Sequence, residues 1–290
     1  MSEVPDVRAR VRERYASIAE GASCGCGCGC ESETASTRAA SRTASTSGCC
    51  TRAGEEDALL RLGYTPEQAA AIPEGADLGL GCGNPIAHAD VKTGETVLDL
   101  GCGAGIDVFL AAQKVGPQGR AIGVDMTAAM IERARAGARR GGATNVEFRL
   151  GEIEHLPVAD ASVDAVISNC VINLSPEKAQ VFREAKRVLR PGGRLVVSDL
   201  VWERAVPADV RARVDALCGC VAGASLKPDY LRLIEEAGFR DVEVVEEGRY
   251  AEPALAPAEE ESIHDAMSAV VSIKVRAFAP AAQGRSTSTS

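Results

Sequence analysis

The chain has 290 residues, of which 46% are hydrophobic and 25% are charged, and its formal net charge is −9. These values are typical of one globular domain with appendages, long enough to bury a sizeable core. The acidic balance argues against nucleic acid and anionic membranes as partners, because both select basic surfaces. No apolar run approaches the roughly 18 residues of a membrane-spanning helix, and the charged start MSEVPDVRARVRERY lacks the hydrophobic core of a signal peptide. We therefore expect a cytoplasmic protein.

Eleven cysteines are unusual for that compartment, because a reducing cytosol disfavours structural disulfides. Clustered thiols there more often bind metals or take part in redox chemistry. The stretch ASCGCGCGCESE contains four cysteines spaced two residues apart, namely Cys24, Cys26, Cys28 and Cys30. The alternating glycines leave this segment without a secondary-structure period. We expect it to capture soft ions by tethering and to leave the chemistry to other cysteines.

Apolar residues recur at helical spacing from Val4 to Ile18, which predicts an amphipathic N-terminal helix. Residues 21–54 have almost no large apolar side chains and are rich in Ser, Thr, Ala, Gly and Cys, so we expect a flexible segment. We therefore predict three regions, namely residues 1–54 (helix and flexible segment), residues 55–280 (folded domain) and residues 281–290 (disordered tail).

Order is predicted to return after Glu55. Thr65-Pro66-Glu67-Gln68 combines a capping hydroxyl, a proline and a glutamine in the register of a helix start. From Thr96 onward, predicted strands and helices alternate. The strands are TVLDL, RAIGVDM, VEFRLGE, VDAVISN and RLVVSDL, and the helices between them are GIDVFLAAQKVG, TAAMIERARAGARRGG and EKAQVFREAKRVLRPGG.

Two later strand-like runs, DVEVVEEGRY and VVSIKVRAF, have no convincing helix between them, so we expect them to pair antiparallel at the edge of the sheet. The alternation upstream predicts a parallel sheet with helices on both faces. The predicted fold is a doubly wound, Rossmann-like α/β domain with a mostly parallel seven-stranded sheet and an antiparallel edge strand.

A glycine-rich turn follows the first predicted strand, with Gly101, Gly103 and Gly105 ahead of a helix. Glycine there lets the backbone approach a ligand at the carboxyl end of the strands. The dinucleotide fingerprint requires a glycine where this chain has Ile106, so a pyrophosphate cofactor is disfavoured. Asp125 ends the second strand, where a carboxylate accepts hydrogen bonds from ribose hydroxyls in related folds.

Glu152 and Ile153 close the third predicted strand, in position to meet the amine and the face of an adenine ring. With the glycine turn and Asp125, this order of strand ends resembles the class I S-adenosylmethionine-dependent methyltransferases, over roughly Glu55 to Ala279. The resemblance implies S-adenosylmethionine as cofactor, with acidic groups around its positive charge. The implied cofactor residues are Asp99, Gly101, Gly103 and Gly105 under the methionine and ribose, Asp125 on the ribose, Met126 and Ile153 on the adenine faces, Glu152 on its amine, and Asn169 at the fourth strand end.

Three more thiols lie where such a sheet gathers its loops. Cys82 stands in GLGCGNP before the first strand, Cys170 follows the fourth strand, and Cys220 lies in LCGCVAGA after the fifth. With few histidines in the chain, clustered thiolates favour a soft centre over a hard ion. Structural zinc sites contain paired C-x2-C motifs, which are absent here.

The motifs PEGADLGLGCGNP, DLGCGAGIDVFLAAQKVG, IGVDMTAAMI, SNCVINLSPEK and CVAGA resemble those of arsenite S-adenosylmethionine methyltransferases. This resemblance implies that Cys82, Cys170 and Cys220 hold trivalent arsenic, with an arsenic-binding region around residues 201–240. It also implies a reactive N-terminal cysteine, Cys50 or Cys49. Cys218 would point about 200° away from Cys220 on a helix, so only one of them fits the same arsenic.

The implied reaction is methyl transfer from S-adenosylmethionine to arsenite, in arsenic detoxification and biotransformation. Cys50 (or Cys49) and Cys82 would form the redox pair, regenerated by thioredoxin or a small thiol. Two alternatives stay open from the residues themselves. One is a methyltransferase of the same fold that acts on a small organic metabolite, and the other is a thiol-rich protein that sequesters metals.

Overall fold

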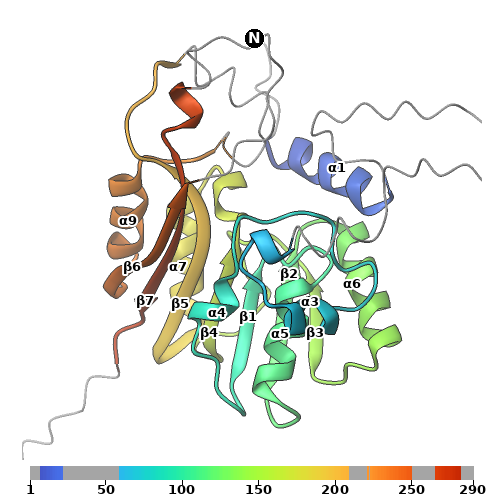
Figure 1. Cartoon of the computed structure of the whole chain (residues 1–290). Coiled ribbons are helices and arrows are strands. Elements are labelled where there is room, and N and C mark those ends of the chain that lie inside the picture. Colours follow the sequence, from blue (N-terminus) through green and yellow to red (C-terminus); the bar gives the residue numbers. More distant parts are fainter. Residues whose placement is uncertain (1–6, 22–58, 209–220, 222, 250–264, 282–290) are drawn as a thin grey trace, which may run out of the picture.

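A seven-stranded sheet with the order β3-β2-β1-β4-β5-β7-β6 forms the centre of the protein (Figure 1). The computed structural model describes residues 7–21, 59–208, 221, 223–249 and 265–281. The pairs among β1 to β5 are parallel, and β7 pairs antiparallel with both β5 and β6. The strands are β1 Thr96–Leu100, β2 Arg120–Asp125, β3 Val146–Leu150, β4 Val163–Asn169, β5 Leu189–Trp202, β6 Arg240–Arg249 and β7 Val270–Phe278.

Helices cover both faces of the sheet, which confirms the doubly wound prediction. Phe109 and Ile131 belong to one apolar cluster, while Phe182, Tyr230 and Ile234 belong to another. The first cluster packs the helices Ile106–Val115 and Ala128–Gly141 on one face, and the second packs the helices Lys178–Val188 and Lys227–Glu236 on the other. The helices are α1 Val7–Ala19, α3 Pro66–Ala71, α4 Pro85–His88, α5 Ile106–Val115, α6 Ala128–Gly141, α7 Lys178–Val188 and α9 Lys227–Glu236, with a 3₁₀ turn η1 at Ile172–Leu174.

The predicted helix start at Thr65 is confirmed. The Thr65 hydroxyl accepts a hydrogen bond from the Gln68 backbone N–H (3.2 Å), and the Gln68 side-chain oxygen accepts one from the Thr65 N–H (2.9 Å). This reciprocal capping box satisfies two donors that the helix itself cannot. The predicted N-terminal helix is present as α1, although its expected first residues lie outside the described part of the chain.

The structure refines three predicted boundaries. The antiparallel strand is β7, and it lies one position inside the edge, which β6 forms. Helix α7 ends at Val188, ahead of Arg190-Pro191, because the residue before a proline is disfavoured in the helical region. Strand β3 ends at Leu150, so the two predicted adenine-binding residues lie in the loop that follows it.

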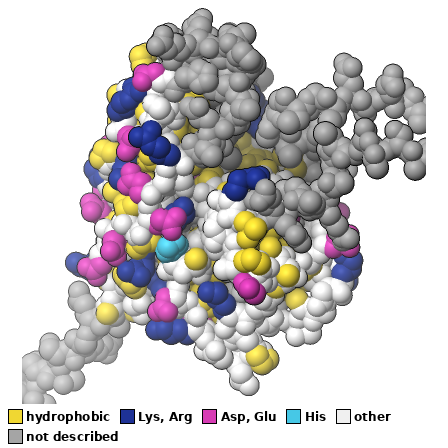
Figure 2. Space-filling view, in the orientation of Figure 1, with side chains coloured by type: hydrophobic (Ala, Val, Ile, Leu, Met, Phe, Trp, Pro, Cys, Tyr) yellow, Lys and Arg dark blue, Asp and Glu magenta, His cyan; other side chains and the backbone are white. Residues whose placement is uncertain are grey.

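The edge of the sheet carries charged side chains. Lys274 forms an ion pair with Glu246 of β6 at 2.8 Å, His88 approaches the same carboxylate at 3.1 Å, and Lys227 pairs with Glu247. Figure 2 shows basic and acidic side chains interspersed over the side on which α9, β6 and β7 lie. Charge on an edge strand disfavours pairing with another chain. Within the described residues, the helices are too short or too polar to cross a membrane.

Candidate functional site

The loop between β1 and α5 has a backbone conformation that favours glycine at Gly101. Gly101 has a φ of +66°, and a Cβ there would collide with the side chain of Val171. The Cys102 N–H donates to the Val124 carbonyl (3.0 Å), and the Gly103 N–H donates to the Asp125 carboxylate (2.9 Å). The loop is therefore held flat against the ends of β1 and β2, with its backbone facing the cavity described next.

A cavity opens at the carboxyl ends of the parallel strands. Gly105, which caps α5, is not on its wall, and neither is Glu152, whose 38% exposed carboxylate lies 3.5 Å from Arg12 on α1. The cavity collects most of the predicted cofactor residues, in agreement with the strand-end reasoning. Those on its wall are Asp99, Gly101, Gly103, Asp125, Met126, Ile153 and Asn169.

The carboxylates of Asp99, Asp107 and Asp125 give the cavity an acidic wall; the first two are buried and Asp125 is half-buried. Burial raises the pKa of Asp107 to about 6, and it also raises the pKa of Asp125. The pKa of Asp99 lies well above its usual range because of its burial and the nearby charges of the other two. Each of these carboxylates is costly to ionise where it lies, so a cationic ligand would stabilise their charged forms. The site is thus suited to a positively charged ligand that carries no phosphate groups.

Asp107 and its partner Tyr64 escaped the sequence analysis. The Tyr64 hydroxyl donates to Asp107 Oδ1 at 2.9 Å, and both side chains line the cavity. An acidic residue in the first turn of a helix usually reflects the helix dipole, so nothing in the sequence marks this one as part of a site. Its role becomes visible only in the structure, where Asp107 is buried in a helix turn whose other side chains are apolar.

The side chain of Asn169 links this cavity to the loop that contains Cys82. Its Nδ2 donates to Asp107 Oδ2 (3.2 Å), to the Tyr64 hydroxyl (3.1 Å) and to the Gly83 carbonyl (2.7 Å). Its Oδ1 accepts the Cys82 backbone N–H at 3.0 Å. The amide of Asn169 therefore has protein partners on both its nitrogen and its oxygen.

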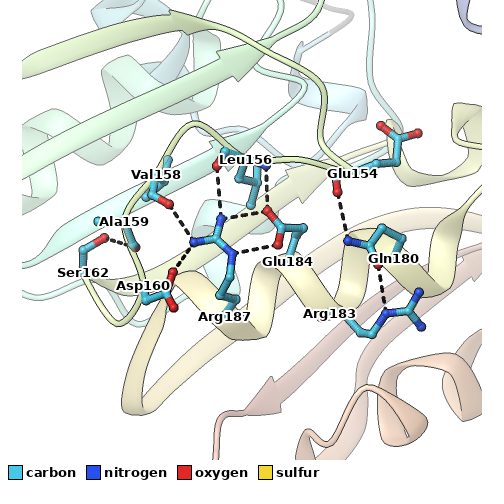
Figure 3. Close-up of polar contacts among 10 residues, drawn as sticks. All are labelled: Glu154, Leu156, Val158, Ala159, Asp160, Ser162, Gln180, Arg183, Glu184 and Arg187. Carbon is cyan, nitrogen blue, oxygen red and sulfur yellow. Dashed lines mark hydrogen bonds and ion pairs between the residues drawn. The ribbon is translucent and has the colours of Figure 1, made fainter.

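The loop after β3 is held in place from the opposite side by α7 (Figure 3). Arg187 donates to the carbonyls of Val158 (2.9 Å) and Leu156 (3.1 Å), and Gln180 donates to the carbonyl of Glu154 (3.2 Å). These bonds fix a segment without regular secondary structure. They hold Ile153 and Glu154 at the cavity wall.

Helix α1 lies across the carboxyl end of the sheet, beside α6 (Figure 1). Val11 and Tyr15 line the cavity from this helix. Arg8, which also lines it, forms ion pairs with the buried Glu154 at 3.3 Å and with Glu177. The N-terminal helix thus contributes one wall of the cavity, a role that its sequence did not indicate.

Cys82 and Cys170 meet in the structure, where they form a disulfide with a Cα–Cα distance of 5.7 Å. Both are buried, and Cys170 also lines the cavity. Cys170 has a φ of +58°, a left-handed conformation that is uncommon outside glycine and is concentrated at functional sites. The structure therefore brings these two thiols together beside the cavity, as the sequence analysis expected.

Asp199 of β5 completes a buried cluster with the two cysteines. One of its carboxylate oxygens and both sulfur atoms lie within 4.8 Å of one another. Burial raises the pKa of Asp199 to about 7, although hydrogen bonds from the Leu200 N–H and the Tyr230 hydroxyl oppose that rise. No sequence pattern singled out this residue, because one aspartate in an apolar strand has no spacing to identify it.

The other predicted cysteines lie outside the described residues. This group comprises Cys220 and its neighbour Cys218, the N-terminal candidates Cys49 and Cys50, and the four cysteines of the alternating segment. The pairing of Cys82 with Cys50 or Cys49 therefore stays a prediction. Cys102 in the glycine loop is free and buried, and its burial raises the pKa of its thiol well above the ordinary value.

Comparisons with known proteins agree with this geometry. Residues 91–238 match the model of a methyltransferase domain family. The chain is 52% identical to an arsenite methyltransferase from Halobacterium salinarum, over 82% of this chain and 59% of the relative, and 40% identical to one from Aquipseudomonas alcaligenes, over 70% and 58%. It thus spans less than two thirds of the length of these two curated relatives.

A solved structure gives the same result, and the match covers a larger share of that relative. The crystal structure of an arsenic(III) S-adenosylmethionine methyltransferase from Chlamydomonas reinhardtii superposes with a TM-score of 0.60 at 36% identity, covering 78% of this chain and 74% of that one. The glycine loop, the strand-end carboxylates and the buried cysteine pair fit that relationship. The chain belongs to the arsenite S-adenosylmethionine methyltransferase family, built on the class I methyltransferase fold.

Proposed function

We propose that this protein transfers a methyl group from S-adenosylmethionine to trivalent arsenic. The observation that carries the proposal is the disulfide between the buried Cys82 and Cys170, of which Cys170 lines an acidic cavity. The cavity is the evidence for the cofactor, and the thiol pair is the evidence for arsenic as the substrate. A methyltransferase for an organic metabolite would have no need for the second feature.

The cofactor would supply an electrophilic methyl group on a positively charged sulfur. Asp99 and the glycine loop would hold its methionine and ribose portions, Asp125 the ribose hydroxyls, and Met126 and Ile153 the faces of the adenine. The buried carboxylates complement the cationic sulfur electrostatically. The carboxylate of Glu152 is turned to Arg12, so its proposed contact with the adenine amine has the weakest structural support of the set.

Cys82 and Cys170 would hold arsenic in their reduced forms, since thiolates prefer a soft centre. Cys220, from the proposed arsenic-binding region around residues 201–240, would be a third ligand. The nucleophile is the arsenic lone pair, which carries no proton, so no general base is required. Catalysis then depends on orienting arsenic toward the methyl group and on excluding water.

Methyl transfer leaves arsenic formally pentavalent, and its reduction takes two electrons. Oxidation of two thiols to one disulfide supplies that number. Cys82 with Cys50 or Cys49 is the pair implied by the family, and the contact between Cys82 and Cys170 makes these two a second possible pair. Thioredoxin or a small thiol would regenerate either pair by exchange.

The test is to incubate the protein with S-adenosylmethionine, arsenite and a thiol, and to identify the arsenic species formed. Cys170→Ser should abolish methylation of every arsenical and leave cofactor binding nearly intact, because a hydroxyl is a poor ligand for a soft centre. Cys82→Ser should block arsenite and partly spare a monomethylated trivalent substrate, which offers fewer positions to thiolates.

The alternatives predict different outcomes. A methyltransferase for an organic metabolite would form no methylarsenical and would keep its own activity in both cysteine variants. A metal-sequestering protein would bind arsenite tightly without consuming the cofactor. Full arsenic methylation by Cys170→Ser would refute the assigned ligand role.

A further inference from the structure

Asp107, at the start of α5, is a buried carboxylate on the cavity wall, with an exposed fraction of 5%. Within the described residues, its hydrogen-bond donors are the Tyr64 hydroxyl and the Asn169 amide, both of which are neutral. Arg8, the one basic side chain on the described wall, pairs with Glu154 and Glu177 instead. Burying a charge without a charged partner is costly, so this position points to a positively charged group on the ligand.

Tyr64 and Asn169 hold the Asp107 carboxylate in one orientation. The Tyr64 hydroxyl donates to Oδ1 at 2.9 Å, and the Asn169 amide nitrogen donates to Oδ2 at 3.2 Å. An ionised carboxylate has about four acceptor positions, so about two remain for a ligand. The Asn169 amide is itself fixed by the Gly83 carbonyl (2.7 Å) and the Cys82 N–H (3.0 Å). Asp107 therefore offers a preoriented hydrogen-bond acceptor as well as a negative charge.

The position of Asp107 along the sheet indicates which part of the cofactor it meets. Asp125, assigned above to the ribose, ends β2, whereas Asp107 is hydrogen-bonded to Asn169 at the end of β4. Strand β1 lies between β2 and β4 in the sheet. A cofactor whose ribose lies at Asp125 would therefore extend its sulfur and its amino acid across β1 toward Asp107. Two cationic groups lie on that end of the cofactor, namely the sulfonium and the ammonium.

We propose that Asp107 binds the ammonium group of the methionine portion of S-adenosylmethionine, with Tyr64 orienting the carboxylate. An ammonium carries three hydrogen-bond donors, which match a carboxylate with unused acceptor positions. The sulfonium has no such donor, and its methyl group has to face the arsenic. The inference rests on the cofactor of the proposed function and is independent of arsenic as the substrate. It makes Asp107 a specificity-determining residue for the cofactor.

The same contact predicts discrimination among adenosine derivatives. S-adenosylhomocysteine, which remains after methyl transfer, keeps the ammonium and lacks the positive charge on sulfur. Methylthioadenosine has the same adenosine and a neutral sulfur but carries no amino acid. Asp107 should therefore contribute equally to the binding of S-adenosylmethionine and S-adenosylhomocysteine, and it should contribute nothing to the binding of methylthioadenosine.

Calorimetric titration of the full chain with these three ligands tests the inference, with displacement titrations for the weaker ones. At about pH 8 the Asp107 carboxyl of the wild type is ionised, because burial raises its pKa only to about 6. Asp107→Asn removes the charge and keeps the size of the side chain. The affinities for S-adenosylmethionine and S-adenosylhomocysteine should both fall at least about tenfold, as expected for the loss of a charge-assisted hydrogen bond. The affinity for methylthioadenosine should stay within about twofold of the wild type.

Asp125→Asn is the matched control, because the ribose assigned to Asp125 is common to all three ligands. It should weaken the binding of the three by a similar factor. Tyr64→Phe removes a hydroxyl that orients Asp107 and keeps the charge of the carboxylate. It should therefore keep the preference for S-adenosylhomocysteine over methylthioadenosine within about threefold of the wild-type ratio. This ratio is measured on one protein sample, so it does not depend on the folded fraction of a destabilised variant.

A loss of affinity for S-adenosylmethionine alone in Asp107→Asn would overturn the inference, because it would assign this carboxylate to the sulfonium. An equal loss for all three ligands would overturn it as well, since a change in packing at the cavity wall acts on all of them. Wild-type affinity of Asp107→Asn for S-adenosylhomocysteine would have the same consequence. A wild-type protein that binds none of the three would contradict the cofactor itself, whereas the arsenic products of the proposed function are measured separately.

Discussion

The side-chain oxygen of Asn169 accepts a hydrogen bond from the backbone N–H of Cys82, at an N···O distance of 3.0 Å. The nitrogen of the same amide donates to Asp107 on the wall of the cofactor cavity. The side chain of Asn169 therefore sets the position of the loop that contains Cys82 relative to the cavity. This arrangement suits Asn169 to a positioning role between the two proposed ligands, and because Asn169 also lines the cavity, the cofactor contact expected from the sequence stays a prediction.

Asn169→Ala should accordingly weaken arsenite binding more than cofactor binding. Loss of the amide removes the bond to the Cys82 N–H, so we expect the affinity for arsenite to fall about tenfold. The fluorescence of Trp202, the single tryptophan, reports this binding because Trp202 is buried in the same cluster as Cys82 and Cys170. Asn145→Ala is the matched control, since the Asn145 amide also holds backbone carbonyls (2.8 and 2.9 Å) but lies away from the cysteines. A larger loss of cofactor affinity than of arsenite affinity would restore the original assignment.

Asp125→Ala should weaken S-adenosylmethionine binding by about 1.5 to 3 kcal/mol, the range for hydrogen bonds to a charged group. Calorimetric titration with the cofactor measures this, and Trp202 fluorescence should show arsenite binding nearly unchanged. Because Asp125 also accepts the Gly103 N–H, a modest drop in thermal stability should accompany the loss. An unchanged cofactor affinity would contradict the strand-end assignment.

Arg8→Ala should weaken cofactor binding several-fold, because Arg8 connects α1 to Glu154 and Glu177 over the cavity. The ion pair to Glu177 adds little stability by itself because Glu177 is exposed, but the variant also removes the ion pair of the buried Glu154, so we expect a loss of unfolding free energy of about 1–3 kcal/mol. Arg10→Ala, an exposed change on the same helix, is the control. Equal cofactor affinities in the two variants would mean that α1 is not needed to cover the bound cofactor.

The raised pKa of Asp199, about 7, predicts a pH dependence of stability. A carboxyl group with a raised pKa in the folded state stabilises that state below its unfolded pKa, near 3.8, and the contribution is lost as pH rises toward 7. Between those values the wild type should lose up to about 1.4 kcal/mol per pH unit relative to Asp199→Asn. Urea unfolding of both proteins at pH 5 and pH 8, with the cysteines reduced, measures the difference. A pH-independent difference would show that Asp199 titrates normally.

Deletion of residues 21–33 tests the four alternating cysteines, which lie outside the described residues. If they only raise the local arsenic supply, turnover at saturating arsenite should stay within about twofold of the wild type, while the arsenite concentration for half-maximal rate should rise. Substitution of the four cysteines by serine separates the thiols from the length of the segment. Loss of turnover at saturation would place the segment in the active site.

Much of the fold could be predicted because its determinants are local. The alternation of apolar strands and amphipathic helices, the capping box at Thr65 and the glycines around Gly101 depend on residues close in sequence, and each matches the structure. The order of strands then brings their carboxyl ends to one edge, which is why the cavity and the meeting of Cys82 with Cys170 were also predictable.

The remaining features depend on contacts between distant segments. Asp199 and Tyr64 acquire their roles through distant partners, such as Asn173, 26 residues from Asp199, and Asp107, 43 residues from Tyr64. The direction of Glu152 depends on α1, whose Arg12 lies 140 residues earlier. By itself the sequence determined the sheet, the glycine loop and the thiols at the strand ends. The tertiary structure alone decided which polar side chains are buried together, because burial and hydrogen-bond partners arise only when the loops pack.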